Sequence, residues 1–252
     1  MTRPLIDSRF RWISYTSISN YNPLNLCLFI VSILIFLDMP QLDIEFSQLF
    51  FSSDVGFKFA DYTVVKLLHW VFGKIHFLYL IALLTMLGLP EWLLLKHVKL
   101  CKRRVRFLLF LLILGPGLVV NVGLKDNFNG RARPDQVTEF GGKHLFTSPF
   151  VITEQCDHNC SFVSGHASAG FVLIGLAWAY GSTGWLLLGT AAGFAVGLGR
   201  IAQGGHFLSD VLFAYWVTYF VSLILAWRYG LTMNSAIEPH RRLIGTSVHA
   251  RE

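Results

Sequence analysis

Three short polar stretches of the sequence carry most of the side chains that could do chemistry. They are "LKDNFNGRARP" (residues 124–134), "CSFVSGHASAGF" (160–171) and "GLGRIAQGGHFLSD" (197–210). Each lies beside an apolar segment. Together they offer several cations, two histidines and a carboxylate four residues after one of the histidines, which is a set able to bind an anion and transfer a group from it.

The first stretch combines Lys125, Arg131 and Arg133 with a following proline. One cation at a helix end commonly extends to the lipid head groups. Three cations in so short a segment, ending in a rigid Arg-Pro, instead indicate an anion site. The planar guanidinium fork matches phosphate oxygens, so we expect a bound phosphate group.

The second stretch places Ser164, Gly165 and His166 directly before an apolar segment. Ser164 is a predicted helix N-cap, and the exposed N–H groups of a helix N-terminus favour an anion. Gly165 lets a ligand approach the backbone closely. His166 could protonate a leaving oxygen. The alternative is an ordinary capped helix with an interfacial histidine.

The third stretch contains Arg200, His206 and Asp210. His206 and Asp210 are four residues apart and share a face if they lie on a helix. Asp210 can then accept the Nδ1 hydrogen of His206, which leaves Nε2 free as a nucleophile or base. Arg200 ends the preceding apolar segment and can reach the same pocket. The alternative is an interfacial ion pair.

Taken together, the stretches favour phosphoryl transfer without a metal. One histidine attacks, the other protonates the leaving group, and the cations stabilise the developing charge. The sequence offers no carboxylate cluster suited to magnesium, no serine hydrolase motif and no glycine-rich nucleotide-binding loop. We therefore expect no cofactor and no metal.

The elements that position these residues are predicted to be membrane helices. The chain has 252 residues, of which 54% are hydrophobic and 14% charged, and its mean hydropathy is +0.53. The apolar residues fall in blocks, which predicts an all-α, polytopic membrane protein. We expect about six transmembrane helices, approximately at residues 24–37, 71–95, 107–124, 167–180, 185–198 and 211–227.

Loop charges predict the orientation. The segment "KHVKLCKRRVR" is strongly basic and should be cytoplasmic, with the acidic loop 38–66 on the opposite side. Residues 1–22 and 230–252 are then cytoplasmic ends around a membrane domain, 23–229. The three polar stretches fall on the non-cytoplasmic face. The formal net charge of +6 follows from this bias, so the expected partner is a bilayer and not a nucleic acid.

Two cysteines, Cys156 and Cys160, lie in "EQCDHNC" within the long polar loop. A disulfide between them is expected if the loop lies outside the cytoplasm. A zinc site that includes His158 is the alternative, but the spacing fits no standard zinc pattern and a fourth ligand is missing.

The three stretches resemble the motifs of the type 2 phosphatidic acid phosphatase superfamily, which also includes vanadium haloperoxidases. The family pattern is Lys, six residues and Arg-Pro; then Pro-Ser-Gly-His; then Ser-Arg, five residues, His, three residues and Asp. This chain has "KDNFNGRARP", "VSGH" and "GRIAQGGHFLSD". Val163 and Gly199 replace the usual proline and serine. One extra residue precedes Arg133, so either that loop bulges or Arg131 shares the role of Arg133.

The resemblance implies a role for each matching residue. His206 would be the nucleophile that forms a phosphohistidine, Asp210 would orient it, and His166 would be the general acid. The residues implied to hold the phosphate are Lys125, Arg133, Arg200, Ser164 and Gly165.

A narrower resemblance, to bacterial lipid A phosphatases, is carried by "GPGLVVNVGLKD", "PFVITEQCDHNCSFVSGHAS" and "RIAQGGHFLSDVLF". It implies removal of the 1- or 4′-phosphate of lipid A at the periplasmic face of a bacterial inner membrane. Undecaprenyl diphosphate and phosphatidylglycerophosphate are alternative substrates. A lipid-to-lipid phosphotransferase would use the same residues. A phospholipid-binding or transport protein would need the cations but not an oriented His–Asp pair and a second histidine.

Overall fold

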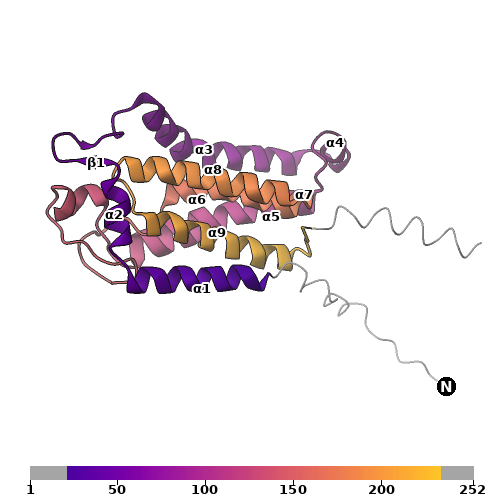
Figure 1. The fold of residues 1–252 in the computed structure, drawn as a ribbon. Coiled ribbons are helices and arrows are strands. Elements are labelled where there is room, and N and C mark those ends of the chain that lie inside the picture. The colour runs from indigo at the N-terminus through magenta and orange to yellow at the C-terminus, as the bar shows by residue number, and fades with distance from the viewer. Residues whose placement is uncertain (1–21, 234–252) are drawn as a thin grey trace, which may run out of the picture.

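The computed structural model describes residues 22–233. The cytoplasmic placement expected for residues 1–22 and 230–252 therefore concerns segments that lie almost wholly outside the described residues. Within them, long helices run side by side (Figure 1). These are α1 (Pro23–Asp38), α3 (Thr63–Gly88), α5 (Lys102–Leu112) continued by the π-helix η3 (Ile113–Lys125), α8 (Thr183–Ala202) and α9 (Leu208–Arg228).

A further helical region is built from three consecutive pieces, α6 (Gly165–Phe171), η6 (Val172–Ile174) and α7 (Gly175–Tyr180). The shorter elements are α2 (Leu42–Gln48), α4 (Glu91–His97), η4 (Pro134–Gln136) and η5 (Thr138–Phe140). Strands β1 (Phe51–Ser52) and β2 (Gly56–Phe57) form a small antiparallel hairpin in which Phe51 pairs with Phe57.

The predicted all-α, polytopic membrane architecture is confirmed. Among the described residues, four helices are long and apolar enough to cross a bilayer: α3, α5 with η3, α8 and α9. A fifth span results if α1 and α2, which are bent by 85° to each other, count as one. Each of the six predicted segments overlaps a helical region, although the region 165–180 is interrupted and the second segment runs over two helices.

The predicted bounds of the second segment, 71–95, were wrong. Helix α3 begins at Thr63 and ends at Gly88, and a separate helix, α4, follows. Pro90 explains the break, because the residue before a proline is pushed out of helical geometry. Leu89 accordingly has φ −75° and ψ 151°. Thr63, Lys66 and His69 lie in the first two turns of α3, so hydropathy alone places the start of this helix too late in the sequence.

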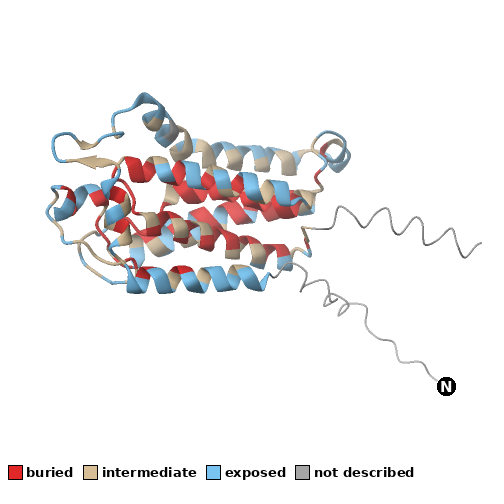
Figure 2. Ribbon diagram, viewed as in Figure 1, coloured by how far each residue is buried: buried red, intermediate tan, exposed pale blue. Residues whose placement is uncertain are grey.

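The core of the bundle lies between α5, α6, α8 and α9. Figure 2 shows that buried positions concentrate there, whereas α1 and α3 are largely exposed. The exposed side chains of α1 and α3 are mainly apolar, including Leu34 and Ile81. Such apolar outer faces are those expected of helices that contact lipid.

Three glycines four residues apart let α8 pack closely against its neighbours. An added Cβ would lie 2.4 Å from the backbone N of Ile174 at Gly189, 2.0 Å from the ring of Phe171 at Gly193, and 2.2 Å from Val211 at Gly197. Small residues at this spacing allow two helix backbones to approach each other. These three glycines form a stripe along α8 that ends at Gly197, before the last turn of the helix.

The two ends of the bundle differ. Helix α2, the β-hairpin, the loop 126–164 and the junction of α8 with α9 lie at one end, and α4 lies at the other (Figure 1). All three polar stretches that the sequence singled out therefore meet at the end opposite α4.

Candidate active site

Backbone hydrogen bonds join the three polar stretches to one another. They run from Ser161 N to Arg131 O (2.9 Å), from Ser164 N to Asp210 O (3.0 Å), and from the N of Asp135, the residue directly after the first stretch, to Gly204 O (3.1 Å). Each stretch is thus tied to both of the others. The residues that the sequence predicted to converge are brought to one place by main-chain contacts.

Asp210 lies in the first turn of α9 and is fully buried. Its Oδ2 accepts hydrogen bonds from the backbone N–H of Phe207 (2.8 Å) and from the Ser161 hydroxyl (2.5 Å). His206 Nδ1 lies 3.4 Å from the same oxygen. The carboxylate is therefore held beside Nδ1, as required to leave Nε2 free.

The His206 ring is completely buried, and neither ring nitrogen meets hydrogen-bond geometry with a partner. The pKa of His206 lies well below its usual value, first because burial disfavours the imidazolium and then because Lys125, Arg200 and Arg133 repel it. Three cations from two separate stretches therefore act on this ring. A neutral ring whose Nδ1 lies beside a carboxylate is suited to nucleophilic attack through Nε2.

Two of these cations are held by Asn159 of the long loop. Lys125 Nζ donates to Asn159 Oδ1 (2.5 Å), and Arg133 donates through one guanidinium nitrogen to the carbonyl of Asn159 (2.8 Å). The backbone N–H of Asn159 in turn donates to Asp126 (2.8 Å). The Lys125 side chain is buried, which is unusual for a lysine. Both cations therefore donate to neutral oxygens and remain able to bind an anion.

Arg200 completes the cationic group from the last turn of α8. Its side chain is 7% exposed, it donates to Gln203, and its Nε has no hydrogen-bond partner. The chain passes directly over the guanidinium at Gly205, where an added Cβ would lie 2.1 Å from an Arg200 nitrogen. Glycine at that position lets the backbone pass this close to the Arg200 guanidinium.

Ser164 is the N-cap of α6, as predicted, and its hydroxyl accepts from Ala167 N (3.3 Å). His166 follows in the first turn. Its ring lies 4.6 Å from that of His69 on α3, and Gly73 of α3 leaves the space that His166 Nε2 occupies. An added Cβ at Gly165 would lie 2.7 Å from Asn121 Oδ1. The start of α6 is thus enclosed by α3 and η3.

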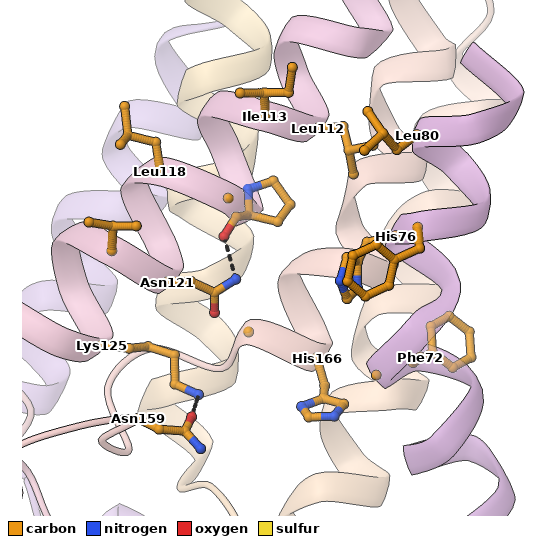
Figure 3. A pocket seen from close by; sticks show the side chains of 17 residues that line it. Phe72, His76, Leu80, Leu112, Ile113, Leu118, Asn121, Lys125, Asn159 and His166 are labelled. Carbon is orange, nitrogen blue, oxygen red and sulfur yellow. Dashed lines mark hydrogen bonds between the residues drawn. The ribbon is translucent and has the colours of Figure 1, made fainter. Parts of the chain in front are cut away.

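A cavity of about 500 Å³ opens between α3, η3 and α6. Figure 3 shows its polar end, where Lys125, Asn159 and His166 lie close together, and its apolar end, lined by Leu80, Leu112 and Ile113. His206, Arg133 and Arg200 are not among its lining residues. Lys125 links the cavity to the group formed by His206, Arg133 and Arg200, because it lines the cavity and its charge also acts on His206.

Arg131 does not lie where a phosphate could bind it, although we expected it to share the phosphate-binding role of Arg133. Its guanidinium is fully buried and donates to Asp43 (2.7 Å), to Asp210 (2.9 Å) and to the carbonyl of Thr147 (2.8 Å). Two carboxylates thus compete for the charge that a phosphate would need. Arg131 therefore points inward, whereas Arg133 lies beside Asn159.

Cys156 and Cys160 form a disulfide, so the zinc alternative has no support. Within residues 22–233, no group of three His, Cys, Asp or Glu side chains is arranged to hold a metal ion. Cys160 is buried, and its backbone N–H donates to the carbonyl of Lys125 (3.2 Å). The disulfide therefore closes a small loop that packs directly against the cationic group.

Sequence reasoning missed Asp43, Asn121 and Asn159. Asp43 is one of several carboxylates in the acidic loop 38–66, and no spacing pattern connects it with residues 131 or 210. Asn159 lies between the two cysteines, and its position there was the one available signal. Asn121 lies inside an apolar segment, where an amide is unusual enough to have been noticed.

The chain is similar to several known proteins. The PAP2 superfamily model matches residues 105–233. A lipid A 4′-phosphatase of Francisella tularensis subsp. novicida (strain U112) is 39% identical over 199 residues, covering 73% of this chain and 87% of that protein. A lipid A 4′-phosphatase of Rhizobium leguminosarum is 33% identical, covering 71% and 83%. Another, of Rhizobium etli, is 34% identical, covering 70% and 75%. No solved structure matches the chain significantly.

Proposed function

This chain belongs to the PAP2 superfamily and is a membrane lipid phosphatase, and we propose that it removes the 4′-phosphate of lipid A. The three relatives named above support this substrate and this position, because each carries the same name and aligns over most of its length. The cavity beside Lys125 and His166 has the polar end and the apolar walls that a phosphorylated lipid needs.

In the proposed reaction the phosphate is held by Lys125, Arg133 and Arg200. Nε2 of His206 attacks phosphorus while Asp210 accepts the hydrogen bond from Nδ1, which stabilises the positive charge that forms on the ring. The bond from phosphorus to the lipid oxygen breaks, and His166, which must be in its protonated form at this step, gives that oxygen a proton. Water then attacks the phosphohistidine and gives a proton to His166, the phosphorus–nitrogen bond breaks, and inorganic phosphate leaves with both histidines restored.

The observation that carries this mechanism is the state of His206. A buried imidazole whose Nδ1 faces a fixed carboxylate and whose surroundings contain three cations suits attack on an anionic phosphoester. A protein that merely binds phospholipids would need the cations without the oriented imidazole. No metal is required at any step, so we propose that the reaction is metal-independent.

The direct test is to incubate the purified protein with lipid A in detergent micelles containing EDTA and to follow the products by tandem mass spectrometry. We expect loss of one phosphate, from the 4′-position, and no loss with His206→Ala. Undecaprenyl diphosphate and phosphatidylglycerophosphate serve as competing substrates. Loss of the 1-phosphate, transfer of phosphate to another lipid, activity that requires added magnesium, or full activity of His206→Ala would each contradict the proposal.

We also propose that the site faces the periplasm from a bacterial inner membrane. Two features support this orientation. The basic segment around α4 lies at the end of the bundle opposite the site, as the bias of basic residues towards the cytoplasm predicts. The Cys156–Cys160 disulfide lies at the site end, in keeping with an oxidising compartment.

A further inference from the structure

The acidic residue Asp43 lies far from the three polar stretches in sequence, yet it is joined to them in space. It belongs to α2, outside the part of the chain that the family model matches, and its side chain is fully buried. Its oxygens accept hydrogen bonds from Arg131 (2.7 Å), from the backbone N–H of Ser209 (2.8 Å) and from the Ser209 hydroxyl (2.6 Å). Asp43 thus holds both Arg131 and the first turn of α9.

Arg131 stands between two carboxylates. One terminal nitrogen donates to Asp43, and the other donates to Asp210 and to the Ser209 hydroxyl. The guanidinium also lies 4.2 Å from the centre of the Phe207 ring. With every one of these contacts formed, the guanidinium has no freedom to turn towards a ligand. Asp210 is consequently fixed from the side that faces away from His206.

The charges of this group matter as much as its geometry. With Asp43 and Asp210 both ionised, the two carboxylates and the one guanidinium carry a net charge of about −1 next to His206, in a region that water does not screen. If Asp43 were neutral, Arg131 would pair with Asp210 alone and the net charge would vanish. The positive charge that His206 acquires on bonding to phosphorus would then lose its electrostatic support.

We propose that Asp43 is a positioning residue for the nucleophile. Acting through Arg131, it keeps Asp210 in place and preserves a negative charge beside His206. This inference rests on the proposed role of His206 as the attacking group.

The first variant is Asp43→Asn, which preserves size and removes the charge. We expect kcat to fall about 10- to 100-fold, the range found for second-layer partners of metal-bound histidines. The KM for lipid A should change little, because Asp43 does not line the cavity. Glu45→Gln is the matched control, since it removes an exposed carboxylate from the same short helix and should leave kcat unchanged.

The second variant adds Arg131→Gln to Asp43→Asn, which leaves Asp210 as the sole charge of the group and restores a net charge of −1. We expect kcat to rise above that of Asp43→Asn alone. A merely structural role predicts the opposite, because a second buried substitution would add to the damage. Size-exclusion profiles of each purified variant establish that the compared proteins are folded.

A measurement independent of turnover separates this inference from the proposed function. Orthovanadate can bond to Nε2 of the attacking histidine as a five-coordinate phosphate analogue, and its affinity is measured by calorimetry. We expect about tenfold weaker binding by Asp43→Asn and partial recovery in the double variant, by the same charge argument. Vanadate binding by the wild type without release of phosphate from lipid A would refute the substrate proposal alone. Equal vanadate affinity and equal kcat in wild type and Asp43→Asn would overturn the inference.

Discussion

Arg131 and Arg133 are two residues apart and serve different parts of the site. Arg131 is enclosed by Asp43 and Asp210, whereas Arg133 is half-buried and donates to a neutral carbonyl of Asn159. The sequence could identify a cationic stretch but could not assign its members, because their partners come from α2 and from the loop 126–164. Partner identity depends on tertiary contacts that no local spacing encodes.

This difference leads to a prediction for Arg133→Gln. The guanidinium should make a charge-assisted hydrogen bond to the substrate phosphate, a contact that contributes about 1.5–3 kcal/mol. We therefore expect kcat/KM for lipid A to fall about 10- to 100-fold, measured by phosphate release from micelles. Lys143→Gln, at an exposed cation of the same loop, is the control and should retain wild-type kinetics. Unchanged kcat/KM in Arg133→Gln would remove this residue from the phosphate site.

At the scale of elements, the loop closed by Cys156 and Cys160 supports the cationic group. Asn159 lies within this five-residue ring and has a positive φ of 54°, an uncommon conformation for a residue with a side chain. Its two oxygens face Lys125 and Arg133. The disulfide restricts the loop to the conformation that presents both oxygens, so the arrangement of the cations depends on it.

Reducing this disulfide should therefore weaken substrate binding. We expect a higher KM and a small change in kcat when the protein is assayed in dithiothreitol, because the cations are less well placed while His206 and Asp210 keep their own contacts. The paired variant Cys156→Ser with Cys160→Ser should show the same kinetics with and without reductant. Cys27→Ser with Cys101→Ser removes the two free cysteines and should respond to reductant as the wild type does. Identical KM in oxidised and reduced enzyme would contradict this role of the loop.

Helices whose residues are continuously apolar were the easiest elements to predict from the sequence. The bounds of α9 and of α8 differ from the expected spans by a few residues, which is the extra length needed to include polar ends. Helix α3 was harder, because Lys66, His69 and Lys74 interrupt its hydrophobic run. Helix α2 was not predicted at all. Its seven residues are too few to produce a clear period, and its role comes from one buried carboxylate.

The whole bundle has the proposed active site at one end and the basic segment around α4 at the other. This polarity predicts which surfaces are accessible from each side of the membrane. In a Cys27→Ser, Cys101→Ser background, a membrane-impermeant maleimide should label Lys143→Cys in intact spheroplasts, because residue 143 is exposed at the site end. Lys99→Cys, exposed near α4, should be labelled only after lysis. The reverse pattern would place the site in the cytoplasm.

The three glycines of α8 set how closely this helix approaches its neighbours, and so they also set the position of the Arg200 guanidinium. Arg200 comes three residues after Gly197, so its guanidinium extends from a helix that glycine alone allows to sit so near α6 and α9. An added methyl group at Gly193, the middle glycine, would push α8 away from α6, and the Arg200 guanidinium would move with the helix. The geometry of the proposed active site therefore depends on three residues that have no side chain.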